Sequence, residues 1–367
     1  MDKKESNLSK MINDPFKGKG GFMPAKIKEK VNIRIGLNEN LVFPENIIKQ
    51  LLQRVASSID PRIYPEDYCE SLADMIAAKH HLNSNQVVIG NGGDKIIDLM
   101  VRLTIVAGKN AVVINPTYPM YEHAIKVQGG GMTEFLLTPA PEFDLDPDYI
   151  LANITPNKDR LLFLCSPNNP TGNQFNESKI RRLISEFPGI VALDETYSNF
   201  AEYSLVDALE EYPNLIIMKS MSKFFGMAGM RLGYALADSF LISRIKELLP
   251  AFNVNVASLE LAKAVFQEEK ILTEITRGIV TERSRVFKKL QEISDIIPYK
   301  SHTNFILFKI RNLEADLIQK KLLKDKGVLV RNMSAMPLCD NCLRMTITTQ
   351  KNNDEFIHAL KETINNL

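Results

Sequence analysis

The chain has 367 residues, of which 45% are hydrophobic and 24% charged, a balance typical of a globular protein with a large core. Its 45 lysines and arginines against 44 aspartates and glutamates give a net charge of +1, which does not favour nucleic acid or an anionic membrane as a partner. Apolar runs are shorter than the roughly 18 residues of a spanning helix and no signal peptide is readable, so we expect a cytoplasmic protein without membrane contact.

The predicted elements begin with two helices, at 45–57 and 68–80, where apolar residues recur on one helical face. Five short apolar runs then read as buried strands, each followed by polar residues: 87–89, 111–114, 161–164, 190–193 and 215–218. Helical stretches such as 177–187 separate several of these strands. This alternation predicts an α/β fold with a mostly parallel central sheet covered by helices.

The character of the sequence changes near residue 270. A long amphipathic helix is predicted at 271–293, followed by strands at 304–310, 328–332 and 343–349 and helices at 314–326 and 353–366. We therefore expect a large domain at 51–270 and a smaller α+β domain at 271–367. Residues 1–50 show no sheet pattern of their own and are expected to form an arm that joins the small domain.

Ligands of parallel sheets gather beyond the carboxyl ends of the strands, so the polar residues at these ends form the candidate site. Gly90-Asn91-Gly92-Gly93-Asp94 follows the first strand and opens a helix, where free backbone N–H groups and the helix dipole suit an anion. A glycine-rich turn is often only a turn. A dinucleotide site is not expected, because the next strand ends at Asn115-Pro116 rather than at an acidic residue.

Three further strand ends carry side chains that suit a flat, charged ring. Tyr118 can stack on such a ring, Asn169 offers a rigid amide, and Asp194 is a carboxylate at the inner end of a buried strand. Each has an ordinary alternative, namely a tyrosine that caps the core, an Asn-Pro turn, and a salt bridge to a neighbouring cation. A pyridinium N–H would pair with Asp194 and compensate its buried charge.

The strand at 215–218 leads into the most informative segment of the chain, Lys219 to Gly233. It holds Lys223 among small and hydroxyl residues, with Arg231 eight positions later. A lysine kept from bulk water loses its proton and forms an imine with an aldehyde, while serine hydroxyls and an arginine bind phosphate. An aldehyde and a phosphate on one small molecule indicate pyridoxal 5′-phosphate. The joint order of all these strand ends outweighs the ordinary alternatives for each.

Together these segments resemble the class I and II aminotransferases of pyridoxal-phosphate fold type I, and among them the histidinol-phosphate aminotransferases, from about residue 38 to residue 348. The resemblance implies that Lys223 carries the cofactor and moves the substrate proton, and that Asp194 pairs with the ring nitrogen. The ring hydroxyl oxygen would be bound by Tyr197 and Asn169, and Tyr118 would stack on the ring. The phosphate would be held by Gly93, Asp94, Ser220, Ser222 and Arg231, the first two largely through backbone groups.

The resemblance extends to a partner subunit and to the substrates. Tyr64 matches a tyrosine that reaches the phosphate of the neighbouring subunit, which implies a homodimer with shared active sites. Arg344 matches the arginine that binds the acidic group of the substrate, and Arg331 matches a second arginine used on a substrate phosphate. Asn38 is also expected at the substrate. For Arg331 an exposed strand-end arginine is the alternative.

The implied reaction takes an amine and a 2-oxo acid: histidinol phosphate and 2-oxoglutarate give imidazole acetol phosphate and glutamate. Some positions depart from the family pattern, however: Gly93, Lys95, Thr196 and Phe252. They leave open a decarboxylase of the phosphothreonine or phosphoserine type, and an aminotransferase for aromatic or other small phosphorylated amines. A cofactor-binding regulator is disfavoured, because the match leaves no room for a DNA-binding helix-turn-helix.

The cysteines carry little functional signal. Cys339 and Cys342 form a C-x-x-C motif, but the second cysteine or histidine pair of a structural zinc site does not accompany it. We therefore expect no metal site.

Overall fold

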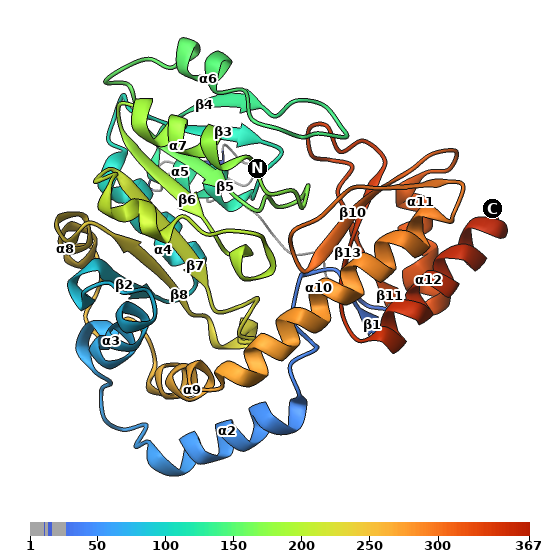
Figure 1. Cartoon of the computed structure of the whole chain (residues 1–367), viewed down its shortest axis with the longest axis horizontal. Coiled ribbons are helices and arrows are strands. Elements are labelled where there is room, and N and C mark those ends of the chain that lie inside the picture. The colour runs from blue at the N-terminus through green and yellow to red at the C-terminus, as the bar shows by residue number, and fades with distance from the viewer. Residues whose placement is uncertain (1–10, 12–13, 17–26) are drawn as a thin grey trace.

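The protein is described by a computed structural model that covers residues 11, 14–16 and 27–367, so most of the first half of the predicted arm lies outside the described residues. Seven strands form the central sheet in the order β2–β8–β7–β6–β5–β3–β4 (Figure 1). Their bounds are β2 Val87–Gly90, β3 Asn110–Asn115, β4 Gly131–Leu136, β5 Asp159–Cys165, β6 Ile190–Asp194, β7 Leu215–Ser220 and β8 Gly233–Ala237. Only β8 runs antiparallel to its neighbours, which confirms the predicted mostly parallel sheet.

Alternate residues of the central strands enter two separate apolar layers, as the two-residue period of a strand requires. One layer contains Val113 and Phe163 together with residues of α4 (Gly93–Thr104), α5 (Met120–Gln128) and α8 (Ser239–Glu247). The other contains Val112 and Leu162 together with residues of α3 (Glu70–Lys79), α7 (Glu177–Glu186) and α9 (Val256–Phe266). Helices therefore cover both faces, which explains why these strands read as continuous apolar runs.

A second, antiparallel sheet lies beside the first, in the order β12–β13–β10–β9. Its strands are β9 Ile296–Pro298, β10 Phe305–Ile310, β12 Arg331–Asn332 and β13 Cys342–Thr346, with α11 (Ala315–Lys326) and α12 (Gln350–Asn365) alongside. The long helix α10 (Glu269–Gln291) connects the two sheets (Figure 1). In the arm, β1 (Ile33–Arg34) pairs with β11 (Val328–Leu329), and α2 (Glu45–Ser58) contacts α9. The remaining helix, α6 (Pro147–Asn153), precedes β5.

The structure differs from the predicted elements in a few places. The helix expected at 68–80 starts at Glu70, because Tyr68 and Cys69 have φ angles of 53° and 56°, outside the helical region. The strand expected at 328–332 is two short strands that pair with different partners. Strands β4 and β8 were not predicted, since β4 carries exposed polar residues and β8 is short and rich in small residues.

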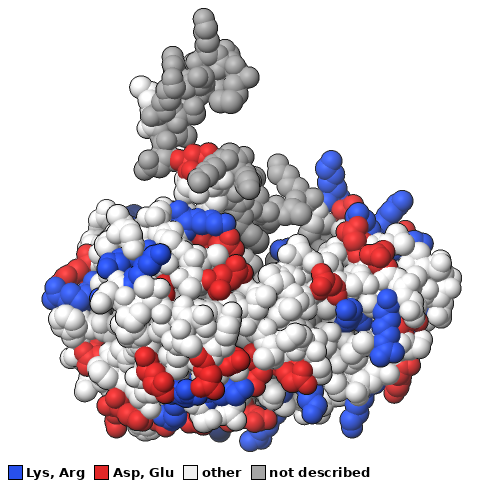
Figure 2. All heavy atoms as spheres, turned by 90° about the horizontal axis from the view of Figure 1, so that it is seen from above, with Lys and Arg blue, Asp and Glu red and all other residues white. Residues whose placement is uncertain are grey.

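The surface agrees with the balanced composition. Acidic and basic side chains are intermixed over the face shown in Figure 2. Among the helices that the structure describes, none is long and apolar enough to span a membrane.

Candidate active site

Three adjacent strands bring the predicted phosphate residues side by side. In the strand register, Gly90 of β2 lies opposite Gly233 of β8, and Gly233 lies opposite Ser220 of β7. A Cβ atom at position 233 would lie 2.5 Å from the backbone nitrogen of Gly93, so only glycine allows this close approach of β8 to the start of α4. The loop between Gly90 and Gly93 and the loop after Ser220 therefore form one continuous edge.

The first turn of α4 has the properties of an anion site. Its first residues, Gly93 and Asp94, have backbone N–H groups without an intrahelical acceptor, at the positive end of the helix dipole. Beside Gly93 there is open space, because an added Cβ would meet no atom within 4 Å. Arg231 Nη2 lies 3.0 Å from Asp94 Oδ2, which brings a guanidinium to the same turn.

The carboxylate of Asp94 also orients the predicted stacking residue. The Tyr118 hydroxyl donates to Asp94 Oδ1 at 2.9 Å, and the Tyr118 ring meets the Tyr121 ring edge-on with centroids 5.7 Å apart. Burial and the neighbouring Asp94 raise the pKa of Tyr118, so its phenol stays protonated at neutral pH. The side chain of Asp94 is thus shared between Tyr118 and Arg231, and its backbone N–H remains available to an anion.

Asp194 ends β6 and is only 4% exposed, as predicted for a buried strand-end carboxylate. The Tyr121 hydroxyl donates to its Oδ2 at 2.6 Å, and the backbone N–H of Thr196 donates to its Oδ1 at 2.9 Å. Burial raises the pKa of Asp194, against the effect of these two donors. Each carboxylate oxygen keeps a further lone pair, so a cationic N–H can still pair with it.

Tyr121 is a site residue that the sequence analysis missed. Its side chain is fully buried and its ring stacks on Phe163, with centroids 4.5 Å apart. The only sequence signal was its position three residues after Tyr118, which lies just before α5 and meets the Tyr121 ring edge-on. Two aromatic residues at this spacing also fit ordinary core packing, so the signal was ambiguous.

Lys223 has the electrostatic setting of an activated amine. Burial, with Arg344 and Arg231 adding repulsion, lowers the pKa of Lys223 from 10.5 to about 8. Its Nζ donates to the carbonyl oxygen of Leu37 at 2.9 Å, a contact with the arm that the sequence did not reveal. Roughly a tenth of this amine is therefore neutral and nucleophilic at pH 7, far more than of a solvated lysine.

The residues on either side of Leu37 contact two more predicted site residues. The Asn38 amide donates to the Tyr197 hydroxyl oxygen at 2.9 Å, and Arg344 Nη2 donates to the Gly36 carbonyl at 3.2 Å. Because Tyr197 accepts this hydrogen bond, its own proton is free to point elsewhere. Three consecutive arm residues therefore order the lysine, the tyrosine and the arginine of the site.

The two predicted substrate arginines face each other on adjacent strands. Arg331 of β12 lies directly opposite Arg344 of β13, which places their Cβ atoms roughly 5 Å apart on one face of the sheet. Arg344 Nη1 donates to Asn169 Oδ1, and its Nε is buried with no hydrogen-bond partner among the described residues. Burial lowers the pKa of Arg344 to about 10. A buried cation with an unused N–H is prepared for an anionic substrate group.

Tyr64, in contrast to the buried residues described so far, lies on the surface of the protein. It is 78% exposed, and its ring stacks on Phe252 with centroids 4.7 Å apart. The Phe252 side chain is itself 41% exposed. A paired, exposed aromatic surface of this kind is typical of a protein interface.

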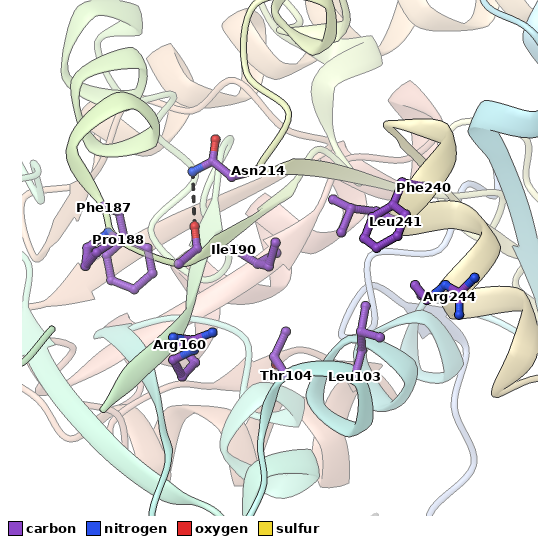
Figure 3. A pocket seen from close by; sticks show the side chains of 11 residues that line it. Leu103, Thr104, Arg160, Phe187, Pro188, Ile190, Asn214, Phe240, Leu241 and Arg244 are labelled. Carbon is purple, nitrogen blue, oxygen red and sulfur yellow. Dashed lines mark hydrogen bonds between the residues drawn. The ribbon is translucent and has the colours of Figure 1, made fainter. Parts of the chain in front are cut away.

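A separate pocket of about 470 Å³ lies at the other end of the central sheet (Figure 3). Arg160 and Ile190, near the starts of β5 and β6, line it, together with Asn214, whose amide donates to the Gly189 carbonyl. Asp194 ends the same strand β6, five residues long, and is therefore roughly 13 Å away along it. This pocket does not belong to the candidate site.

The C-x-x-C motif lies in the protein interior. Cys339 and Cys342 are both buried, and burial raises the pKa of each thiol to about 12. Thiols of this kind are protonated and unreactive at neutral pH. Among the described residues, no group of three or more His, Cys, Asp or Glu side chains could hold a metal ion.

The chain is similar to known proteins over most of its length. Residues 29–360 match the family "Aminotransferase class I and II". The chain belongs to the class I and II aminotransferases. A histidinol-phosphate aminotransferase of Methanosphaera stadtmanae is 33% identical over 346 residues, which cover 93% of this chain and 92% of the relative. The family assignment confirms the resemblance predicted from the sequence, and with it a pyridoxal-phosphate-dependent enzyme.

Solved structures confirm fold type I for this aminotransferase. The crystal structure of a histidinol-phosphate aminotransferase from Sinorhizobium meliloti in complex with pyridoxal 5′-phosphate has a TM-score of 0.84 at 24% identity, covering 92% of this chain and 91% of that one. An L-threonine-O-3-phosphate decarboxylase from Porphyromonas gingivalis has a TM-score of 0.79 at 20% identity, covering 91% and 99%. The fold alone therefore does not separate these two activities.

The side chains of this aminotransferase fit pyridoxal phosphate. The free N–H groups and open space at Gly93 suit its phosphate, the lone pairs of Asp194 suit its pyridinium N–H, and the Lys223 amine suits its aldehyde. The phosphate, the pyridinium N–H and the aldehyde of this one ligand thus each have a complementary protein group.

The pH dependence of cofactor capture tests the state of the Lys223 amine. Only the neutral amine attacks an aldehyde, so we expect the capture rate of the cofactor-free enzyme to rise with pH along a titration with a midpoint of about 8. The rate is measured by rapid mixing with pyridoxal phosphate and visible absorbance. An N-acetylated peptide with one solvated lysine, which has no free α-amine, is the control, and its midpoint should lie near the ordinary value of about 10.4. The same midpoint for the enzyme and the peptide would show that burial does not lower the pKa of Lys223.

Proposed function

We propose that this enzyme transfers the amino group of histidinol phosphate to 2-oxoglutarate, giving imidazole acetol phosphate and glutamate. The observation that carries the proposal is the pair Arg331 and Arg344, opposite each other on β12 and β13. Two adjacent guanidiniums suit the two carboxylates of glutamate in one half-reaction and a phosphate in the other. The names of the curated relatives support the same substrate.

The cofactor would be held by the residues predicted from the sequence. Its phosphate would bind Gly93, Asp94, Ser220, Ser222 and Arg231, and its ring would contact Tyr118, Asn169, Asp194 and Tyr197. When bound, pyridoxal phosphate supplies an aldehyde that bonds to amines and a ring that takes up the electron pair left when the α-proton of the substrate departs. Lys223 Nζ would accept that proton as general base, and its lowered pKa keeps the free amine largely neutral above about pH 8.

The arm positions two of these groups. Leu37 offers its carbonyl oxygen to the Lys223 amine, which holds that amine in place when it is not covalently engaged. Asn38 was predicted to bind substrate, and its amide donates to the Tyr197 hydroxyl oxygen. Asn38 would then act partly through Tyr197, whose own proton would be free to be donated to the ring hydroxyl oxygen.

We further propose a homodimer in which Tyr64 reaches the cofactor phosphate of the partner subunit. The support within one chain is the exposed Tyr64 and Phe252 stack, which would be covered in such a dimer. The cytoplasmic location also stays a prediction.

A decarboxylase of amino-acid phosphates is the second candidate, because one such enzyme shares the fold. The two activities differ in their products. Transamination converts the amine to a carbonyl product and 2-oxoglutarate to glutamate, whereas decarboxylation releases carbon dioxide and needs no 2-oxo acid.

A substrate panel with an arginine variant tests the proposal. The enzyme is given histidinol phosphate, phosphothreonine, phosphoserine and phenylalanine in turn, and glutamate and carbon dioxide are both measured. We expect glutamate formation with histidinol phosphate, and a loss of about 10- to 100-fold in kcat/KM for that substrate in Arg331→Ala, since a charged hydrogen bond to phosphate is removed. The same variant should lose little with an amine that lacks phosphate.

Arg160→Ala is the matched control, because Arg160 lines the distal pocket of Figure 3 rather than the site. It should leave the kcat/KM of every substrate unchanged. Carbon dioxide release without glutamate, or equal losses in Arg331→Ala for phosphorylated and phosphate-free amines, would rule out the proposed substrate.

A further inference from the structure

A buried ion pair lies between the ends of β6 and β7, outside the predicted cofactor contacts. Lys219 Nζ is 2.7 Å from Glu195 Oε2, and the two side chains are 7% and 2% exposed. Removing two charges from water costs more free energy than their attraction returns, unless further hydrogen bonds complete the arrangement. A buried ion pair is therefore expected only where further hydrogen bonds satisfy both charged groups or where the pair has a functional role.

The pair is fully bonded. Besides Glu195, the Lys219 ammonium donates to Ser198 Oγ at 2.8 Å and to Ser204 Oγ at 3.3 Å, which accounts for its three protons. Glu195 Oε2 also accepts from the Ser204 hydroxyl at 2.5 Å, and Oε1 accepts from the Leu205 backbone N–H at 2.7 Å. We call Glu195, Ser198, Ser204 and Lys219 the ion-pair network.

Three members of the ion-pair network are direct sequence neighbours of predicted cofactor residues. Glu195 follows Asp194, Ser198 follows Tyr197, and Lys219 precedes Ser220. Successive residues of a strand point to opposite faces, so Lys219 extends away from the face that carries Ser220. The network thus lies on the reverse side of the same backbone segments that present the cofactor groups.

The backbone between these segments is joined as well. The Glu195 N–H donates to the Met218 carbonyl at 2.8 Å, which continues the pairing of β6 and β7 beyond Asp194. The ion pair between Glu195 and Lys219 then joins the same two strand ends through their side chains. The bond from Lys219 to Ser198 also ties β7 to the turn that carries Tyr197. A shift of either strand end along the other would break several of these bonds together.

We propose that the Glu195 and Lys219 pair is a positioning device for the cofactor, which fixes the spacing of Asp194, Tyr197 and Ser220 so that all three contact one rigid ligand. Apolar residues of similar volume would stabilise the fold as well as a buried ion pair does, but they lack its directional bonds. The inference rests on the pyridoxal-phosphate dependence of the family and not on the choice of amine.

The test separates stability from cofactor binding. In Glu195→Gln and in Lys219→Met one charge stays buried without its partner, so both cofactor affinity and the melting temperature of the cofactor-free enzyme should fall. In the double variant no lone charge remains, and the melting temperature should return towards that of the unaltered enzyme. Cofactor affinity should stay at least about tenfold weaker, the coupling expected within one network.

Affinity is measured by titrating the cofactor-free protein with pyridoxal phosphate, and the visible circular dichroism of the bound cofactor reports its orientation. Arg285→Met combined with Asp354→Asn is the control, because this partly buried pair, 2.7 Å apart, joins α10 to α12 instead. The control should change stability alone.

A double variant that binds the cofactor as tightly as the unaltered enzyme, with the same circular dichroism, would show that the pair is only structural and would overturn the proposal. The double variant decides the matter even if the single variants do not fold. Failure of the unaltered enzyme to bind pyridoxal phosphate would instead contradict the cofactor assignment, so the two failures are distinguishable.

Discussion

Replacing Lys223 with alanine is expected to lower kcat for glutamate formation by at least about 10⁴-fold, because in the proposed mechanism this one side chain supplies both the covalent link to the cofactor and the base for the α-proton. The structure supports this double role by burying the amine and lowering its pKa to about 8. Steady-state glutamate formation measures the loss, and visible absorbance shows whether the cofactor is still bound covalently. Full activity in this variant would end the proposed mechanism.

The loss must be distinguished from unfolding. The folded-state pKa of Lys223, about 8, lies below the ordinary 10.5, so between these values the unfolded chain binds more protons than the folded one. Stability of the cofactor-free enzyme should therefore rise with pH in this window, and the alanine variant should lose that contribution without losing its fold. Lys179→Ala on α7 is the control with normal activity, because it removes only a partly exposed ion pair with Asp144.

Much of the large sheet could be predicted because its strands are buried on both faces and read as uninterrupted apolar runs. The Lys219 to Gly233 segment was equally readable, since it combines a lysine, serines, glycines and an arginine in one short stretch. Strand β4 was missed for the opposite reason: it is an edge strand with exposed polar residues such as Glu134. The local sequence pattern thus predicted strands that are buried on both faces, but it did not predict an edge strand that is partly exposed.

The contacts that complete the site could not be predicted, because they join residues far apart in the chain. Leu37 meets Lys223 through a backbone carbonyl, which any residue type could offer. The sequence predicts Tyr121 only as a core tyrosine, and the structure is needed to show that its hydroxyl donates to Asp194. Glu195 and Lys219 look like ordinary neighbours of site residues, and only the pairing of β6 and β7 brings them together.

Asp194→Asn is the second change for which we expect a large effect, a fall in kcat of about 10³- to 10⁴-fold. The Thr196 N–H donates to Oδ1, so the asparagine oxygen would take that position and its amide nitrogen would face the Tyr121 hydroxyl, which can accept. The fold is thereby retained. The ring nitrogen, however, would meet a neutral amide instead of a carboxylate and would lose the charge that keeps it protonated.

The Asp194→Asn variant should lose activity without losing thermal stability. Burial raises the pKa of Asp194, which means that the ionised carboxylate is held in the folded, cofactor-free enzyme at a cost. Asparagine removes that cost, so the melting temperature of the cofactor-free protein should stay the same or rise. Tyr121→Phe is the matched control, because it removes one donor to Asp194 but leaves the charge, and its loss in kcat should be only about tenfold. A cofactor-free Asp194→Asn protein that melts well below the unaltered one would show that the carboxylate is structural, whereas a normal melting temperature with lost turnover assigns it to the cofactor.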